Sequence, residues 1–415
     1  MSSSGRLEGV IWCRLFRRAN QRAVLLRIHA QIKTQGSLRH ALPARRSKFR
    51  PTPRKAPLYD PEQATADMDA TPPVPIISLG GEGDESPLGP KILDAVVQTG
   101  FFYLADHGIT PQEIDLLFSQ SAEFFLHEPE AERVRCQDRN NNTGYTAMQQ
   151  EQLDPTSRAG GDLKESFYLA GLSRAEGGSS SVDPQYRPPS QMLPPTLAQH
   201  REAISTFIEK CKGICDAVLA GFAEAIDLPS NFFTDSHHGQ HDRLRLIHYP
   251  PTPIVDPDAE STLATSIRAG SHSDYGSCTL LFQKDVGGLQ VETKPQQWVD
   301  IPPQKGCIVV NVGDAMEFWS AGLFRSTQHR VVLPRSASES GSRFSVAYFC
   351  QPDEDARLVP LDISDNIREK CRGDLMARDE FQRRCAAKGV SNAAELTGGQ
   401  HLRARLTASY RPTRS

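Results

Sequence analysis

A His-x-Asp pair and a later histidine lie on strand-like segments of this 415-residue chain, and this placement restricts the folds open to it. His272 and Asp274 are two residues apart in SHSDYGSCTLL, and His329 opens the β-branched run HRVVLP, which ends at Pro334. Residues i and i+2 of a strand point to one face of a sheet, so His272 and Asp274 can approach one ion together. Ligands converging from separate strands predict a mixed α+β fold: a double-stranded β-helix (jelly-roll, cupin-like) core with flanking helices.

The chemistry of these three side chains favours iron. Two neutral imidazoles and one carboxylate form a nitrogen–oxygen set that suits Fe(II) and leaves three coordination positions for small molecules. Arg343 and Ser345 form R-x-S in SRFSVAYF and share a strand face with Ala347 and Phe349. A buried guanidinium needs an anion, so this pair predicts a carboxylate site. Taken singly, His272 is best interpreted as a hydrogen-bonded loop histidine and Arg343 as a surface arginine. The order of the motifs on successive strand-like segments favours a metal site with a neighbouring carboxylate site.

The segments HSDYGSCTLLFQKDVGGLQV and WVDIPPQKGCIVVNVGDAMEFWSAGLFRSTQHRVVLP resemble the core of the non-haem iron, 2-oxoglutarate-dependent dioxygenases of the isopenicillin-N-synthase-like group. Upstream, VPIISL, TGFFYLADHGI, GYTAMQQEQLD, DLKESFYL and RLRLIHYPP extend the resemblance over residues 73–352. The resemblance implies that His272, Asp274 and His329 bind Fe(II), with 2-oxoglutarate and O2 as cosubstrates.

The resemblance also implies a cosubstrate site. Arg343 and Ser345 match the R-x-S that binds the distal carboxylate of 2-oxoglutarate. Tyr249 matches the tyrosine before proline that commonly hydrogen-bonds this cosubstrate, although a cavity-wall tyrosine is the alternative interpretation. Many relatives carry asparagine two residues earlier, where this chain has Ile247, so we expect one polar contact to be missing.

The expected activity is oxidation of a small organic molecule of secondary metabolism by hydroxylation, desaturation or cyclisation, with succinate and carbon dioxide released. One alternative is an iron oxidase of the same fold that does not use 2-oxoglutarate, as in isopenicillin N synthase. A less favoured alternative is a non-catalytic relative. The segments around Tyr145, the strand DLKESFYL and the C-terminal helices are expected to select the substrate.

Charge divides the chain into a basic beginning and an acidic body. Residues 1–59 hold 14 Lys or Arg and one acid, Glu8, which leaves 33 basic and 49 acidic residues in the rest. The acidic body argues against nucleic-acid binding. The basic segment predicts either a disordered tail or a mitochondrial-type transit peptide, so a cytoplasmic location is expected with a mitochondrial one as the alternative. The sequence contains no run of 18 apolar residues, so we expect no membrane-spanning helix. The protein is expected to be a monomer.

We expect four regions along the chain. They are a basic, disordered extension over 1–72, a helical and strand region over 73–235, the Fe(II)/2-oxoglutarate jelly-roll over 236–352 and a helical tail over 353–415. Within them we expect helices over 88–98 and about 196–226, a helix after the capping box at Thr110 and Glu113, and a loop over 174–190.

The remaining cysteines and histidines suggest structural roles. Nine scattered cysteines without a C-x-x-C pair argue against a zinc site or a disulfide framework, and Cys211 and Cys215 are expected on the apolar face of their helix. The histidines of SHHGQH, which are His237, His238 and His241, are expected to be solvated rather than to bind metal. His107 is expected to be structural, and Gly287-Gly288 to form a turn.

Overall fold

The computed structural model describes residues 72–80, 86–138, 143–154, 161–170, 172, 191–254, 267–371, 378–390 and 395–409. The extension expected over 1–72 lies outside these ranges except for its last residue, and the loop expected over 174–190 lies outside them entirely. No helix in the described ranges is long and apolar enough to cross a membrane.

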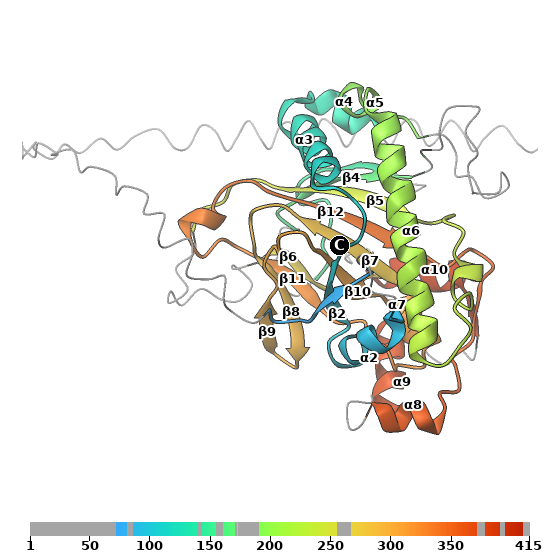
Figure 1. Cartoon of the computed structure of the whole chain (residues 1–415). Helices are drawn as coiled ribbons and strands as arrows, with labels where there is room; N and C mark the ends of the chain where they lie inside the picture. The colour runs from blue at the N-terminus through green and yellow to red at the C-terminus, as the bar shows by residue number, and fades with distance from the viewer. Residues whose placement is uncertain are drawn as a thin grey trace, which may run out of the picture. The chain divides into compact units, whose positions relative to one another are not determined.

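Two facing sheets form the centre of the molecule (Figure 1). The large sheet has the strand order β1-β2-β10-β7-β12-β5-β4-β3, and the small sheet has the order β6-β11-β8-β9. The bounds are Ile76–Ser78 (β1), Phe101–Ala105 (β2), Gly144–Thr146 (β3), Glu165–Leu169 (β4), Arg243–Tyr249 (β5), Ile267–His272 (β6), Cys278–Gln283 (β7), Leu289–Lys294 (β8), Gln297–Asp300 (β9), Ile308–Val312 (β10), His329–Val332 (β11) and Arg343–Cys350 (β12).

From β5 to β12 the chain passes repeatedly between the two sheets. β5, β7, β10 and β12 join the large sheet, whereas β6, β8, β9 and β11 join the small one. This alternation is the double-stranded β-helix predicted from the ligand spacing. Strands β1 to β4 also join the large sheet, so strands from both sides of the expected 235/236 boundary share one hydrogen-bonded layer.

Strand parity separates the two faces of the large sheet. On β5, Leu244 and Leu246 belong to the main apolar core, whereas Ile247 and Tyr249 belong to a small cluster between the sheets. On β12, Ala347 belongs to that same inner cluster, as the R-x-S parity predicts. The outer face therefore carries most of the buried apolar side chains, and the inner face is left for polar chemistry.

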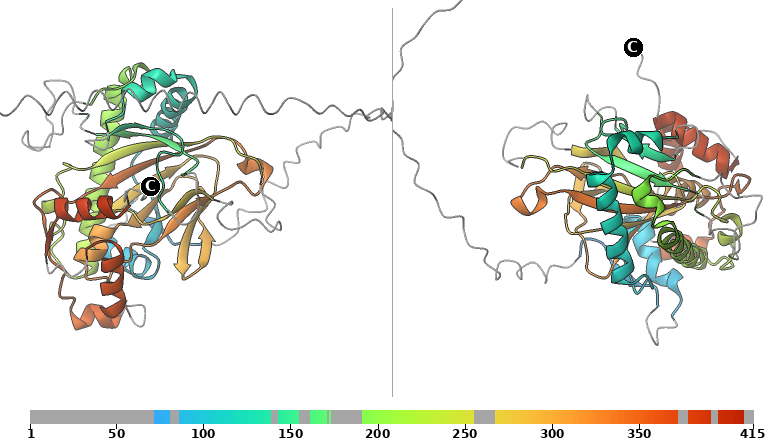
Figure 2. Two further views of the ribbon diagram at one scale, coloured as in Figure 1. Left: turned by 180° about the vertical axis from the view of Figure 1, so that it is seen from behind. Right: turned by 90° about the horizontal axis from the view of Figure 1, so that it is seen from above.

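Helices cover the outer face (Figures 1 and 2). α3 packs on β5 and β12, and α6 packs on β7, β12 and α2. Thr110 caps α3 as predicted, with its hydroxyl accepting from the Glu113 N–H and its own N–H bonding the Glu113 carboxylate. The helical bounds are Leu88–Gln98 (α2), Pro111–His127 (α3), Glu130–Arg135 (α4), Pro195–Ala198 (α5), Arg201–Ala225 (α6), Asp314–Trp319 (α7), Asp365–Lys370 (α8), Arg378–Ala387 (α9) and Gly398–Ser409 (α10).

The expected helix over 196–226 is interrupted. A short α5 precedes α6, and His200 between them leaves helical geometry with φ −108° and ψ 12°. The Thr196 N–H donates to the Glu128 carboxylate at 3.0 Å, which ties α5 to the end of α3. This contact joins residues 68 positions apart and keeps α5 separate from α6. The apolar periodicity of the sequence does not predict such a long-range contact.

The expected placement of Cys211 and Cys215 on the apolar face of their helix is confirmed. Cys211 and Cys215 are fully buried on α6, and every described cysteine is a free thiol. The sulfurs of Cys215, Cys278 and Cys350 lie within 4.8 Å of one another in the main apolar core. They are therefore on the face of the large sheet that points away from the small sheet.

Candidate active site

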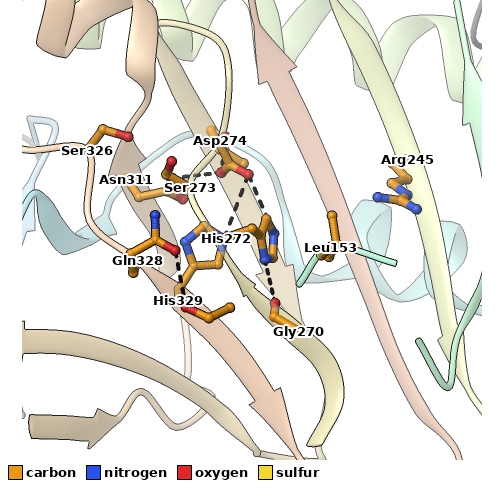
Figure 3. A network of polar contacts seen from close by, with 12 residues as sticks. Leu153, Arg245, Gly270, His272, Ser273, Asp274, Asn311, Ser326, Gln328 and His329 are labelled. Atoms are coloured by element: carbon orange, nitrogen blue, oxygen red, sulfur yellow. Dashed lines mark hydrogen bonds and ion pairs between the residues drawn. The ribbon is translucent and has the colours of Figure 1, made fainter. Parts of the chain in front are cut away.

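The three predicted ligands meet between the sheets (Figure 3). His272 ends β6, and His329 begins β11 directly opposite it in the antiparallel ladder. Asp274 follows in the turn after β6, and its Oδ1 lies 4.0 Å from His272 Nε2 and 3.7 Å from His329 Nε2. One ligand atom from each residue falls within 4.8 Å of the other two, so a single ion can contact all three.

Surrounding hydrogen bonds orient each of these side chains. The Nδ1 atoms of His272 and His329 lie 2.9 and 3.2 Å from the carbonyl oxygens of Gly270 and Thr327. A carbonyl only accepts, so each Nδ1 carries the proton and each Nε2 presents its lone pair to the centre. The two imidazole rings are 4.2 Å apart at their centroids.

Two donors hold Asp274. The Thr279 hydroxyl and the Asn311 amide donate to Oδ2 at 2.7 and 2.8 Å, which leaves Oδ1 directed at the imidazoles. Thr279 lies on β7 and Asn311 on β10, and strand register brings both inner-face side chains to the same carboxylate.

The ionisation states match a metal site. Burial and the neighbouring His329 lower the pKa of His272 to about 3, so this imidazole is neutral near pH 7. Burial raises the pKa of Asp274, but the facing His329 and His272 and the two donors bring it below its usual range. Two imidazole nitrogens and one carboxylate oxygen converge at this point, and this donor set fits Fe(II).

The predicted R-x-S lies further along the inner face. Arg343 is 1% exposed, and it donates from Nε to the Gly287 carbonyl at 2.9 Å and from Nη2 to Gln283 Oε1 at 3.0 Å. The Ser345 hydroxyl is 3.4 Å from Nη1. The expected Gly287-Gly288 turn, with Gly288 at φ +104°, therefore also supplies an acceptor that fixes the guanidinium.

Tyr249 lies directly opposite Arg343 across the β5–β12 ladder, and the guanidinium carbon is 4.9 Å from the centre of its ring. Ile247 lies opposite Ser345 in the same ladder and packs among apolar side chains. The hydrocarbon side chain thus occupies the inner-face position where many relatives carry asparagine.

Sequence reasoning missed a second buried arginine at this end of the site. Arg268 on β6 is 1% exposed and donates from Nη2 to the Thr252 hydroxyl at 2.8 Å. Burial and the charge of Arg343 lower its pKa to about 10, so it remains a cation near pH 7. Within the described part of the chain, neither Arg268 nor Arg343 forms an ion pair with a carboxylate.

A cavity of about 320 Å³ opens beside His272 and Asp274. Its aromatic wall contains Tyr168, Tyr275 and Phe349. Its charged side chains include Glu151, Arg243 and Arg245 from the region of the large sheet, and α10 closes one side with Leu402, Arg403 and Leu406. Strand DLKESFYL, the segment that follows Tyr145 and the C-terminal helix therefore all contribute side chains to the cavity. Tyr145 itself packs in the main apolar core and bonds Glu165.

A buried ion cluster supports the wall. Glu151 contacts Lys164 at 2.8 Å and Arg245 at 2.6 Å, and Lys164 also contacts Asp162 at 2.9 Å. Asp162 accepts from the Gly270 N–H beside the ligand strand. Burial alone would raise the pKa of Glu151, but its two cations hold that pKa well below its usual range. Arg245 and Leu153 lie on the cavity side of the triad in Figure 3.

The expectation that SHHGQH is solvated is wrong for His237. This side chain is 1% exposed, lies 2.7 Å from the Ser277 hydroxyl and stacks on Trp319. Its partners are 40 and 82 residues away in the sequence, so the local polarity of the run did not reveal them. His241 lines the cavity and contacts Glu354 at 3.1 Å, whereas His238 is largely exposed. His107 is buried and accepts from the Ile109 N–H, in agreement with a structural role.

Buried charge ties the C-terminal helices to the triad. Asp314 on α7 contacts Arg405 of α10 at 2.6 Å and also contacts Lys388, which follows α9. The Asp314 N–H donates to the Asp274 carbonyl at 2.8 Å. The position of α10 and the turn that carries Asp274 therefore depend on the same carboxylate.

This arrangement predicts a pH-dependent free energy of unfolding. His401 on α10 is 1% exposed, and burial lowers its pKa to about 4, with Asp314 raising it and Arg405 and Lys388 lowering it. Between about pH 6.5 and about pH 4, this histidine is protonated in the unfolded chain, where its pKa is about 6.5, but stays neutral in the folded chain. The free energy of unfolding therefore decreases as the pH is lowered through this window. His401 contributes at most about 1.4 kcal/mol per pH unit.

Urea unfolding between about pH 7.5 and about pH 4.5 checks this, because these values bracket the titration of an unfolded histidine. The His401→Leu variant should lose less stability over that range than the native chain, and replacement of exposed His127 by Leu should leave the slope unchanged. Equal slopes for the native chain and His401→Leu would contradict the prediction.

Comparison with known proteins agrees with this geometry. A family model of the 2OG-Fe(II) oxygenase superfamily matches residues 240–352, and one for the N-terminal part of a non-haem dioxygenase in morphine synthesis matches residues 74–194. A UPF0676 protein of Schizosaccharomyces pombe is 34% identical over 69% of this chain and 84% of its own length. A 2-oxoglutarate-dependent dioxygenase of Didymella fabae is 30% identical over 68% of this chain and 85% of its own.

A solved structure shows the same fold. A full-length Neurospora crassa protein in complex with alpha-KG and thymine superposes with a TM-score of 0.61 and 28% identity, covering 81% of this chain and 97% of that one. The chain belongs to the Fe(II)- and 2-oxoglutarate-dependent oxygenase family, in the isopenicillin-N-synthase-like group. It is a non-haem iron dioxygenase that uses Fe(II), 2-oxoglutarate and O2.

Proposed function

We propose that this dioxygenase hydroxylates, desaturates or cyclises a small organic metabolite in the cavity beside His272 and Asp274. The observation that carries the proposal is the convergence of Nε2 of His272 and His329 with Oδ1 of Asp274, beside a cavity that His272 and Asp274 line. His272, Asp274 and His329 would hold Fe(II). With 2-oxoglutarate and O2, iron in such a site supplies oxidative decarboxylation of the cosubstrate, coupled to oxidation of a substrate C–H bond.

Arg343, Ser345 and Tyr249 would bind the distal carboxylate of 2-oxoglutarate. The Arg343 fork is held in place by Gly287 and Gln283, so little side-chain freedom is lost when an anion binds. Arg268 adds positive potential at this end and favours a dicarboxylate. Because Ile247 cannot donate a hydrogen bond, cosubstrate binding would depend on these cations and on the Ser345 and Tyr249 hydroxyls.

The protein would orient the substrate and exclude water. Tyr168, Tyr275 and Phe349 present flat apolar surfaces, and α10 closes the side of the cavity. The Neurospora crassa structure contains thymine, a small flat molecule, and a cavity of about 320 Å³ accommodates a ligand of that size class. We further propose that the protein acts as a monomer on small molecules, without nucleic acid or membrane, and in the cytoplasm.

The test is a screen of small metabolites for substrate-dependent succinate release from the Fe(II)-loaded protein. We expect one class of compound to give succinate and oxidised product in equal amounts. Oxidation of a compound without consumption of 2-oxoglutarate would instead indicate the isopenicillin-N-synthase-like oxidase. Failure to retain Fe(II) would indicate a non-catalytic relative.

A further inference from the structure

Among the charged side chains that line the cavity, arginines outnumber carboxylates by one once Asp274, which faces the two imidazoles, is set aside. Apart from His272 and Asp274, its charged lining consists of Glu151, Arg243, Arg245, Glu354 and Arg403, together with His241. Glu151 pairs with Arg245 at 2.6 Å, and Glu354 pairs with Arg403 at 2.7 Å. Lys164, the other partner of Glu151, is itself balanced by Asp162. Arg243 is the cation of the cavity lining that takes part in none of these ion pairs.

Arg243 is placed to receive a ligand. It is the first residue of β5 and lies opposite Phe349 in the ladder with β12, on the inner face that also carries Arg245 and Tyr249. Its Nη1 donates to the Asp242 carbonyl at 2.9 Å, which orients the side chain without neutralising it. Among the residues that the structure describes, no carboxylate forms an ion pair with Arg243.

The charge on Arg243 persists in this environment. Burial lowers the pKa of Arg243, although Asp242 and Tyr168 act in the opposite direction, and a guanidinium does not lose its proton in proteins near neutral pH. A half-buried cation without a counter-ion costs free energy, and its planar fork matches a carboxylate. The complementary ligand is therefore an anion, and a carboxylate fits best.

Arg243 and Arg343 do not compete for the same anion. In the β5–β12 ladder Arg343 lies opposite Tyr249, and Arg243 lies opposite Phe349. The two arginines are thus six residue positions apart along this pair, or roughly 20 Å at about 3.3 Å per residue. The five-carbon 2-oxoglutarate cannot bridge that separation, so a second anion can bind at the Arg243 end while the cosubstrate is present.

The surroundings of Arg243 indicate the shape of this second ligand. Tyr168 and Phe349 have ring centroids 6.4 Å apart with an interplanar angle of 37°. The Tyr275 ring, next to Asp274, is covered by Arg405 at 5.0 Å. The Arg245 guanidinium carbon lies 4.4 Å from the centre of the Tyr168 ring. A ligand therefore meets the ring surfaces that these arginines leave uncovered, and such surfaces favour a flat, unsaturated body.

We propose that the primary substrate is a small organic acid with a flat, unsaturated body, and that Arg243 binds its carboxylate while the aromatic wall holds the rest. This inference rests on the proposed function and adds the substrate class. Arg243 then acts as a specificity-determining residue, because its charge favours an acid over neutral flat molecules such as thymine.

The experiment compares carboxylic acids with their uncharged primary amides. Benzoate and benzamide, phenylacetate and phenylacetamide, and cinnamate and cinnamamide are titrated without oxygen into the full chain loaded with Fe(II) and 2-oxoglutarate, with thymine as a neutral flat probe. Binding is followed by the change in the visible Fe(II)–2-oxoglutarate charge-transfer band. We expect at least one acid to bind roughly ten- to a hundredfold more tightly than its amide, the range for a hydrogen bond to a charged group.

Three variants make the comparison specific. Arg243→Gln should keep the charge-transfer band but lose the preference for acid over amide, and Arg243→Lys should restore part of it. Arg357→Gln, which changes an exposed arginine paired with Glu395, should behave like the native chain.

Equal binding of acids and amides, tighter binding of thymine than of every acid, or an acid preference that survives in Arg243→Gln would each overturn the inference while leaving the proposed function intact. Absence of the charge-transfer band in the native chain would overturn both.

Discussion

Replacement of Asp274 by Ala should abolish turnover and reduce Fe(II) binding while the fold remains. The carboxylate is the only anionic donor of the three converging side chains, and its Oδ1 lies within 4.0 Å of both imidazole Nε2 atoms. Loss of partners that merely orient ligands typically costs about ten- to a hundredfold in metal affinity or activity, so loss of the ligand itself should exceed about a hundredfold. The variant leaves only two imidazole nitrogens, which hold a divalent cation poorly.

Thr279→Val is the graded control for this prediction. It removes the hydroxyl that donates to Asp274 Oδ2 at 2.7 Å but leaves His272, Asp274 and His329 in place. Fe(II) affinity should fall by about ten- to a hundredfold. Metal content after equilibrium dialysis and circular dichroism separate a lost site from a lost fold. Full occupancy by iron in folded Asp274→Ala would show that another set of residues binds the metal.

Replacement of Arg343 by Ala should raise the 2-oxoglutarate requirement severely. The guanidinium is buried and is fixed by Gly287, Gln283 and Ser345, and no described carboxylate neutralises it. Removing one partner of a buried charge pair costs about 2–5 kcal/mol. This corresponds to a roughly thirtyfold to several thousandfold weaker cosubstrate at about 1.4 kcal/mol per decade.

Two comparisons localise the effect of Arg343. Ser345→Ala should cost less, because it removes one neutral hydroxyl, and Arg243→Ala should leave 2-oxoglutarate affinity near its native value. Fe(II) affinity should change little in all three variants, because His272, Asp274 and His329 remain in each of them. The check is titration of 2-oxoglutarate into each Fe(II)-loaded variant. Unchanged cosubstrate affinity in Arg343→Ala, with loss of primary substrate binding, would favour the oxidase that does not use 2-oxoglutarate.

Residues whose roles follow from local backbone geometry could be predicted from the sequence. The two-residue period of a strand places Arg343 and Ser345 on one face, and the same parity puts Ala347 inside the barrel. The capping box of α3 and the apolar stripe of α6 also depend only on neighbouring residues. The relation between His272 and His329 required knowledge that their strands pair, which the family resemblance supplied.

Roles that depend on register between distant strands could not be predicted in the same way. Asn311 and Thr279 support Asp274 only because β10 and β7 are neighbours, and neither residue stands in a distinctive local pattern. Arg243 looks like an ordinary strand arginine until the ion pairs of Glu151 and Glu354 are known. Likewise, His237 appears solvated until Trp319 and Ser277 are brought against it.

If His272, Asp274 and His329 bind one Fe(II), 2-oxoglutarate should chelate this ion while Arg343 holds its distal carboxylate. An oxygen-free titration of the metal-free chain, first with Fe(II) and then with 2-oxoglutarate, follows both events by visible absorption. We expect one equivalent of Fe(II) per chain and a charge-transfer band that appears only when 2-oxoglutarate is added. The band should be absent in Asp274→Ala and should require far more 2-oxoglutarate in Arg343→Ala. A native chain that binds Fe(II) but develops no band at saturating 2-oxoglutarate would contradict this assignment of the site.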